Sequence, residues 1–246
     1  MKKIILSLVI ALTTVSLYAQ IDRSTMPEAG PAPTINLEEP IRFELKNGLT
    51  VMVVENHKLP RVSIQLSIDN PPSLEGEKAG VSSLAAGLLG NGSTNISKDA
   101  FNEEVDFLGA SLNFGASSAF ASSLSKYFPR ILELMADAAI NPNFTEEEFQ
   151  KEKEKLLTGL KSQEKDVSAM AERVQSAIAY GKEHPYGEFA TEETVNKVSL
   201  EDAKKFYQTY FNPNNAYLVI IGDVDTKAVK KLVKKHFNSW EKGAQV

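Results

Sequence analysis

Three runs of alternating apolar and polar residues constrain the fold of this chain more than any other feature. Residues 41–46 and 49–53 alternate on either side of Asn47-Gly48, and residues 61–69 alternate in the same way. A period of two is typical of strands that bury one face, and Asn-Gly between two such runs is the strongest short-range hairpin signal. The folded part is therefore predicted to begin with a β-hairpin and a third strand.

Helical patterns dominate much of the remaining chain. A helix rich in small residues is predicted at about residues 79–89, and sequences typical of a capping box open helices at Thr145 and Ser199. The charged residues 146–155 predict a solvated face on the helix that follows Thr145. A further predicted helix carries four apolar residues, Met170, Val174, Ala177 and Ile178.

Strands return between and after these helices. Residues 110–124 are typical of two short strands with serine-rich faces, and residues 216–222 of a buried strand. Strands, then helices, then a returning strand favour an α+β fold, with an antiparallel-rich mixed sheet and helices packed on one face. No shift in composition divides this part, so residues 41–243 are interpreted as one domain.

The N-terminal residues have the pattern of an export signal. Two lysines precede an apolar run that ends at Leu17-Tyr18-Ala19, and the run is shorter than the roughly 20 apolar residues of a membrane span. We therefore expect a cleaved signal peptide at residues 1–19, a periplasmic or secreted location, and no membrane span after cleavage. Residues 20–40 are rich in proline and in small or acidic residues, which predicts a disordered linker.

Charge and cysteine content exclude several classes of function. The formal net charge is -5, whereas nucleic-acid binding and attachment to anionic lipid both call for clustered positive charge. The chain contains no cysteine, so disulfides, zinc–thiolate sites and thiol catalysis are excluded. We therefore expect no nucleic-acid partner.

Short segments along nearly all of residues 41–240 carry a resemblance to one peptidase family. Each segment is a weak signal alone, but together they occur in the order found in the first half of a pitrilysin, insulinase or mitochondrial processing peptidase subunit. The matching segments are residues 45–51, 80–93, 108–113, 141–144, 184–187, 211–215 and 222–224. The resemblance implies the α+β fold of one half of such a subunit.

The chain departs from that family at its zinc site. The family's zinc helix reads H-x-x-E-H, whereas Ser83, Ala86 and Gly87 stand at these positions here. The third ligand of the family is a glutamate seven residues after another glutamate; if Glu152 matches the earlier one, Gly159 occupies the ligand position. None of the four residues offers a zinc ligand or a base. We therefore predict no catalytic residue, no metal site and no cofactor in this chain, with zinc only in a partner subunit.

No substitute metal site is indicated by the remaining residues. The histidines lie far apart in the sequence without paired helical spacing, and no acidic loop of the EF-hand type is present. A structural or solvent role is the simpler interpretation of each histidine, His57, His184 and His236.

The resemblance also implies a peptide-binding strand. In the family, a peptide adds to an exposed sheet edge near the zinc through main-chain hydrogen bonds, which need no metal. The corresponding strand is at about residues 110–117, with four candidate binding residues, Ser111, Asn113, Gly115 and Ser117. The alternative is an ordinary strand whose serines face solvent.

Three functional hypotheses remain open. The first is an exported, non-catalytic accessory subunit that binds peptide substrates and pairs with a family homologue carrying an intact zinc motif. The second is an independent binding or structural scaffold, or a truncated family fragment. The third is a zinc metalloendopeptidase with unrecognised ligands. Because the family's chamber closes between two halves, a single half is also expected to expose apolar surface and to associate.

Overall fold

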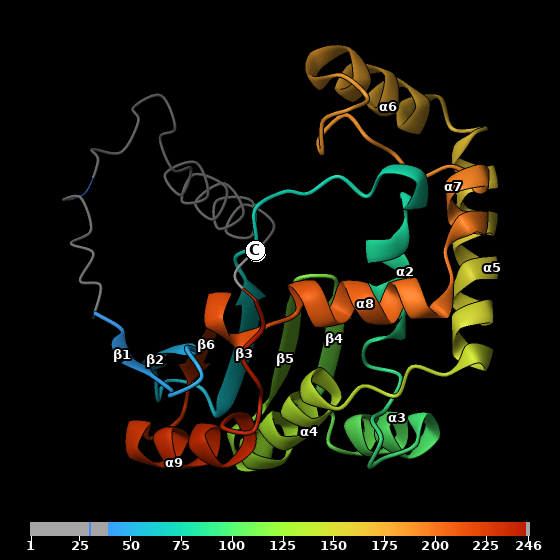
Figure 1. Ribbon diagram of the computed structural model, residues 1–246. Coiled ribbons are helices and arrows are strands. Elements are labelled where there is room, and N and C mark those ends of the chain that lie inside the picture. Colours follow the sequence, from blue (N-terminus) through green and yellow to red (C-terminus); the bar gives the residue numbers. More distant parts are fainter. Residues whose placement is uncertain (1–29, 31–38, 245–246) are drawn as a thin grey trace, which may run out of the picture. The chain divides into compact units, whose positions relative to one another are not determined.

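The computed structural model describes Gly30 and residues 39–244 (Figure 1). The expected signal peptide and nearly all of the expected linker therefore lie outside the described residues. Among the helices in the described ranges, none combines the length and apolar character that a membrane crossing needs. The main elements are β1 (Ile41–Glu44), β2 (Thr50–Glu55), β3 (Arg61–Ile68), α2 (Val81–Leu88), α3 (Lys98–Phe107), β4 (Ser111–Gly115), β5 (Ser118–Leu124), α4 (Phe128–Ile140), α5 (Glu146–Gln163), α6 (Val167–Tyr180), α7 (Glu192–Lys197), α8 (Leu200–Tyr210), β6 (Ala216–Gly222) and α9 (Thr226–Phe237).

The six strands form one mixed sheet in the order β1-β2-β6-β3-β5-β4. The pair β2–β6 is parallel, and the other four pairs are antiparallel. The hairpin predicted around Asn47-Gly48 is confirmed, and Gly48 adopts the positive φ of 92° that this turn requires. The antiparallel-rich mixed sheet expected from the alternating runs is therefore present.

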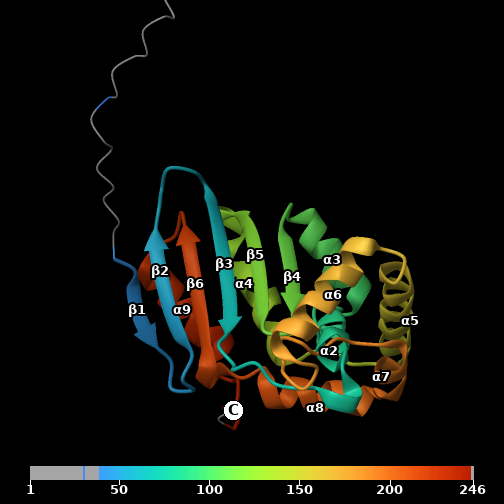
Figure 2. The same ribbon diagram turned by 90° about the horizontal axis from the view of Figure 1, so that it is seen from above.

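One face of the sheet is buried against α4 and α9, which lie behind the strands in Figure 2. Alternate residues of β3 point into this layer, so Val62, Ile64 and Leu66 are almost completely buried. Helix α4 packs against this face with Ile131, Leu132, Leu134 and Met135 fully enclosed. The prediction that helices cover one face is confirmed.

A second, smaller core lies beside the sheet, between α2, α5, α7 and α8. Leu84 and Leu88 of α2 pack here with Phe149 of α5 and Val195 of α7, all close to fully buried. Burial of these side chains fixes α2 against α5, which is the pair of helices that carries the degenerate zinc positions.

Helix starts follow the predicted capping residues, with one correction. Ser199 and Asp202 form a reciprocal capping box, as predicted. The Thr145 hydroxyl accepts a hydrogen bond from the main-chain N–H of Glu148 at 3.3 Å. The Glu148 carboxylate does not accept the reciprocal hydrogen bond from the main-chain N–H of Thr145. It pairs instead with Lys98 and, at 3.0 Å, with Lys151. The predicted box at Thr145 is therefore only half formed, because long-range and i,i+3 lysines compete for the glutamate.

The solvated charged face predicted for residues 146–155 is correct only in part. Glu147 is exposed and pairs with Lys151 at 2.7 Å, the predicted i,i+4 interaction. Glu148 and Glu152 instead point inward, with side chains 15% and 19% exposed. This inward placement brings one carboxylate next to α2.

Candidate functional site

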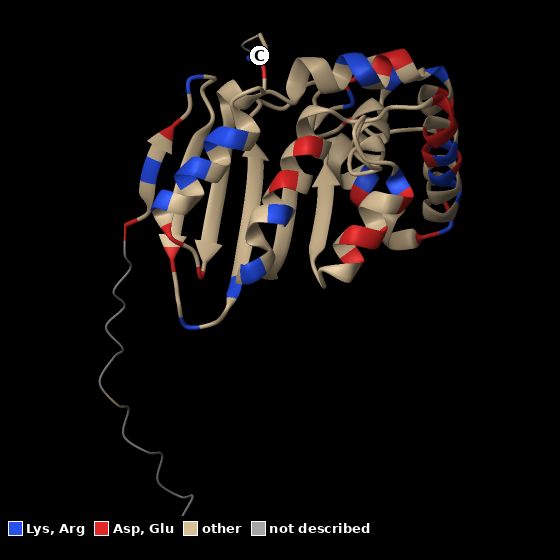
Figure 3. Ribbon diagram, turned by 90° about the horizontal axis from the view of Figure 1, so that it is seen from below, with Lys and Arg blue, Asp and Glu red and all other residues tan. Residues whose placement is uncertain are grey.

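The face of the sheet opposite α4 and α9 is open and largely uncharged. Between β6 and β4, one cross-strand row contains Val219, Gln65, Phe120 and Asn113. A neighbouring row contains Ile221 with three serines, Ser63, Ser122 and Ser111. Most charged residues lie instead on the helices (Figure 3). A neutral face bearing hydroxyl and amide groups suits recognition of an uncharged chain such as a peptide backbone.

Strand β4 forms one end of the sheet, as the peptide-binding hypothesis requires. Ala116-Ser117 is a two-residue turn that joins Gly115 to its partner Ser118. In an antiparallel ladder with this register, the main-chain groups of Leu112 and Phe114 point away from β5. No strand in the described part of the chain pairs with this outer edge.

The four candidate residues of this edge do not share one environment. Ser111, Asn113 and Gly115 lie on β4 and on the open face of the sheet. Ser117 lies in the turn, where its carbonyl oxygen accepts a hydrogen bond from the Ile68 amide at 2.8 Å. The strand therefore ends two residues earlier than predicted, and Ser117 is held by β3 rather than placed on the free edge.

The zinc-helix positions lie on one face of α2. Val81, Leu84, Ala85 and Leu88 of this helix are buried, which leaves Ser83 exposed and Ala86 and Gly87 partly exposed. Just beyond α2, a Cβ atom at Gly90 would lie 2.7 Å from the Phe114 ring, so this glycine allows the chain after the helix to approach β4 closely. Ser83, Ala86 and Gly87 thus flank the open edge, which is the arrangement that the resemblance implies.

Glu152 occupies the space that a side chain at Gly87 would need. A Cβ atom at Gly87 would lie 2.7 Å from Oε2 and 3.1 Å from Cδ of Glu152. The same Oε2 accepts a hydrogen bond from Lys155 Nζ at 3.3 Å, which makes an ion pair. The sequence pattern alone did not reveal this contact, because residues 146–155 carry charges on every side of the helix.

These residues do not fit a zinc ion. Ser83, Ala86, Gly87 and Gly159 provide no imidazole or carboxylate, and Glu152 is a lone carboxylate paired with a lysine. A Cβ at Gly159 would have nothing within 4 Å, so this position contributes no contact to α2. Within the described ranges, no group of three or more His, Asp or Glu side chains could hold a metal ion.

The histidines lie in three separate environments. His57 Nδ1 is 2.7 Å from Asp223 Oδ1, and this hydrogen bond raises the pKa of His57 above its ordinary value. His184 packs in a cluster with the Tyr180 and Tyr186 rings, whose centroids are 5.4 and 5.3 Å from that of His184. Burial lowers the pKa of His236, which lines a groove between α4 and α9. The structural or solvent role predicted for each histidine is consistent with these contacts.

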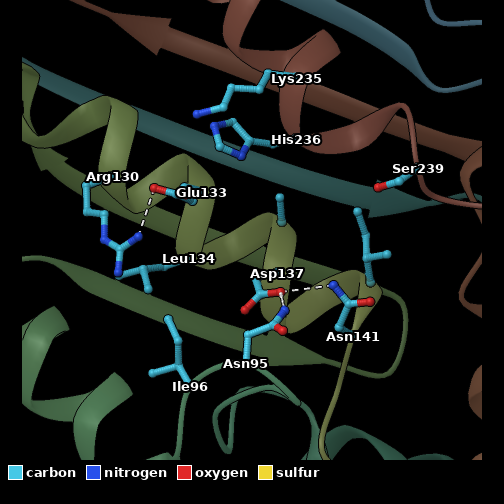
Figure 4. A pocket seen from close by; sticks show the side chains of 12 residues that line it. Asn95, Ile96, Arg130, Glu133, Leu134, Asp137, Asn141, Lys235, His236 and Ser239 are labelled. Carbon is cyan, nitrogen blue, oxygen red and sulfur yellow. Dashed lines mark hydrogen bonds and ion pairs between the residues drawn. The ribbon is translucent and has the colours of Figure 1, made fainter.

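That groove has a volume of about 540 Å³ (Figure 4). Its polar side chains bind one another: Asp137 accepts hydrogen bonds from the Asn95 and Asn141 amides at 2.7 and 2.9 Å, and Arg130 pairs with Glu133 at 2.8 Å. The groove lies between α4 and α9, the helices that cover the buried face of the sheet, and not on the open face. Its internal pairing is typical of a structural network that ties α4 to the loop before α3.

Comparison with known proteins identifies the family. The model of the insulinase family, peptidase family M16, matches residues 50–189, and the model of the peptidase M16 inactive domain matches residues 197–246. The chain therefore belongs to the insulinase family (peptidase family M16). The family predicted from the short segments is confirmed, and the zinc helix lies within the first match.

Relatives in this family include both a zinc protease and a non-peptidase homologue. The chain is 27% identical over 207 residues to the zinc protease PqqE of Helicobacter pylori, covering 79% of this chain and 46% of that protein. It is 24% identical over 199 residues to the non-peptidase homolog YmxG of the same organism, covering 78% and 46%. A crystal structure of a Helicobacter pylori protease has the same fold, with a TM-score of 0.75 and 24% identity over 85% of this chain and 52% of that chain. The chain thus spans about half the length of the curated relatives it matches.

Proposed function

We propose that this protein is a non-catalytic member of the insulinase family. On this proposal it is an exported accessory subunit that holds extended peptides at the β4 edge and pairs with a zinc-bearing homologue. The observation that carries the proposal is the packing of Glu152 against Gly87, at the position of the family's second histidine.

Two features of the former ligand positions support a non-catalytic role. The ligand positions lack every donor atom that zinc requires, and hydrolysis needs a base beside a metal-bound water. In addition, the space beside Gly87 is filled by a carboxylate that is paired with Lys155. A histidine could enter only if Glu152 moved, so the site differs from a zinc site in packing as well as in composition.

Peptide binding is supported by the features that remain. The outward main-chain groups of Leu112 and Phe114 provide the donors and acceptors for an added strand. Ser111 and Asn113 would flank alternate side chains of the bound peptide on the open face. None of these interactions requires a metal ion.

The main-chain character of this binding gives a direct prediction. Two versions of one short unstructured peptide that binds the chain, each N-methylated at every second residue but in opposite phases, are expected to differ strongly in affinity. The version methylated at the residues facing β4 loses its hydrogen bonds and should bind at least tenfold more weakly, since each lost bond costs about 1 kcal/mol or more. Fluorescence anisotropy measures both affinities, and equal weakening of the two versions would contradict strand addition.

Export and pairing rest on the N-terminal signal pattern and on the family's two-half organisation. They are tested by recovering the tagged mature chain from its native cell envelope and identifying the retained proteins by mass spectrometry. Recovery of a homologue with an intact H-x-x-E-H motif supports an accessory subunit. Its absence from such preparations would favour the independent scaffold instead.

A further inference from the structure

Helix α9 concentrates positive charge on its outer side. Its 12 residues include five lysines and no aspartate or glutamate. Val229, Val233 and Phe237 are buried, and the lysines fall within one arc of the remaining surface of the helix. These residues, which we call the α9 lysine face, are Lys227, Lys230, Lys231, Lys234 and Lys235. In Figure 3, the basic residues recur along the length of α9.

The α9 lysine face has no counter-charge of its own in the described part of the chain. None of the ion pairs formed there includes one of its five lysines. Across the groove on α4, Glu133 is paired with Arg130 at 2.8 Å, and Asp137 accepts hydrogen bonds from two asparagine side chains. On α5, by contrast, Lys151 pairs with Glu147 of the same helix. The positive charge of α9 is therefore available to an external anion.

This local cluster corrects the expectation drawn from the net charge. A net charge of -5 argues against attachment to anionic lipid only if the charges are evenly mixed. The fold separates them instead, and electrostatic interactions at physiological salt fade over about 8 Å. Asp225, the nearest acidic residue in the sequence, is held as the cap of α9, where it accepts a hydrogen bond from the Ala228 amide at 2.9 Å. An anionic surface lying against α9 is therefore attracted by the lysines more than it is repelled by acidic residues on other faces.

We propose that the α9 lysine face binds the anionic surface of a phospholipid membrane. Clusters of basic residues along one helix are typical of such binding, which is electrostatic and reversible. The face carries lysine alone, and lysine is a strongly hydrated point charge that suits a diffuse anionic surface. A protein partner is less well matched, because protein interfaces are enriched in aromatic residues and arginine and depleted in lysine. The expected export also places the chain beside membranes rather than nucleic acid. This inference goes beyond the proposed function and does not depend on it.

The position of α9 in the fold is compatible with peptide binding at the same time. Helix α9 covers the buried face of the sheet, whereas Ser111 and Asn113 lie on the open face. In Figure 2, α9 lies behind the strands, away from the open face. A chain that binds a membrane through α9 therefore keeps its open face directed away from the lipid. Because the apolar side of α9 is buried in the domain, the contact should involve charge alone and should be sensitive to salt.

Vesicle co-sedimentation tests the proposal. The mature chain is mixed either with vesicles of phosphatidylcholine or with vesicles of equal parts phosphatidylcholine and phosphatidylglycerol. We expect binding to the anionic vesicles alone, with the binding lost as the salt concentration rises. Lys231→Glu combined with Lys234→Glu should weaken this binding about tenfold or more, because two of the five attractive charges become repulsive. The new carboxylates can pair with lysines one turn away on α9, so the helix should be maintained.

A matched control makes the same change of charge elsewhere on the chain. Lys165→Glu combined with Lys182→Glu alters two exposed lysines outside α9 and gives the same net charge as the α9 variant. This control should bind the anionic vesicles like the parent chain. Equal sedimentation of the parent chain with neutral and anionic vesicles would overturn the proposal, as would equal weakening by the two double variants. Binding to duplex DNA under conditions in which the chain does not bind the anionic vesicles would also overturn it and would assign the face to nucleic acid.

Discussion

Replacing Gly222 by alanine is expected to destabilise the domain by about 2–5 kcal/mol, through backbone strain and a backbone clash together. Gly222 ends β6 with a positive φ of 138°. A Cβ atom there would lie 2.1 Å from the Arg61 carbonyl oxygen and 2.8 Å from the Val62 Cα. These are backbone atoms of a paired central strand, so no side-chain rotation can relieve the overlap.

The clash would also disturb the junction at which three strands meet. The Gly222 carbonyl oxygen accepts hydrogen bonds from the main-chain N–H groups of Asn56, at 2.7 Å, and Val224, at 2.9 Å. The main-chain N–H of Asp223 donates to the Arg61 carbonyl oxygen at 2.9 Å. Urea unfolding followed by circular dichroism measures the loss of stability. Gly159→Ala is the matched control: it lies in a helix with nothing within 4 Å of the new Cβ, so it should gain about 0.5–1 kcal/mol. Equal stability of Gly222→Ala and the parent chain would show that the junction is wrongly described.

Replacing Asn47 by alanine is expected to destabilise the domain by about 2–4 kcal/mol, because two hydrogen bonds to buried carbonyl groups are lost. The Asn47 side chain donates to the Phe237 carbonyl at 2.8 Å and to the Trp240 carbonyl at 2.9 Å. Asn47 is only 8% exposed, and Phe237 and Trp240 are buried, so water cannot easily replace the lost donor. The amide thus caps the end of α9 from within the first hairpin.

A second substitution separates these hydrogen bonds from simple packing. Asn47→Asp preserves the size of the side chain but places a carboxylate against two carbonyl oxygens at neutral pH, so it should destabilise at least as much as Asn47→Ala. Asn56→Ala, at an exposed asparagine in the loop after β2, should change the free energy of unfolding by less than about 0.5 kcal/mol. If Asn47→Ala is no worse than Asn56→Ala, the link between the hairpin and α9 does not hold the fold together.

Local features of the fold could be predicted from the sequence because local interactions determine them. The alternation of β3, the hairpin at Asn47-Gly48 and the capping box at Ser199 each depend on residues a few positions apart. The same pair, Asn47-Gly48, also shows where such reasoning ends. Its turn was predictable, but the bonds from Asn47 to residues 190 and 193 positions away were not.

In the candidate site, too, some features could be predicted from the sequence and others could not. The loss of the zinc donors at Ser83, Ala86 and Gly87 is visible in the sequence. The close approach of Gly90 to Phe114 places the end of α2 beside β4, as the resemblance implied. The inward turn of Glu152 was missed because charged residues surround it on α5 and mask any periodicity. Ser117 was placed on the strand because a serine-rich run does not mark where a two-residue turn begins.

Zinc content is the measurement that tests the central claim most directly. The purified mature chain is exposed to excess zinc, separated from free metal by gel filtration, and analysed by mass spectrometry for metal per polypeptide. A chain without ligands at residues 83, 87 and 159 should retain far less than one equivalent and should not cleave unstructured peptides. One zinc ion per chain, together with peptide cleavage that a chelator abolishes, would contradict the account and identify the protein as a zinc peptidase with a different ligand set.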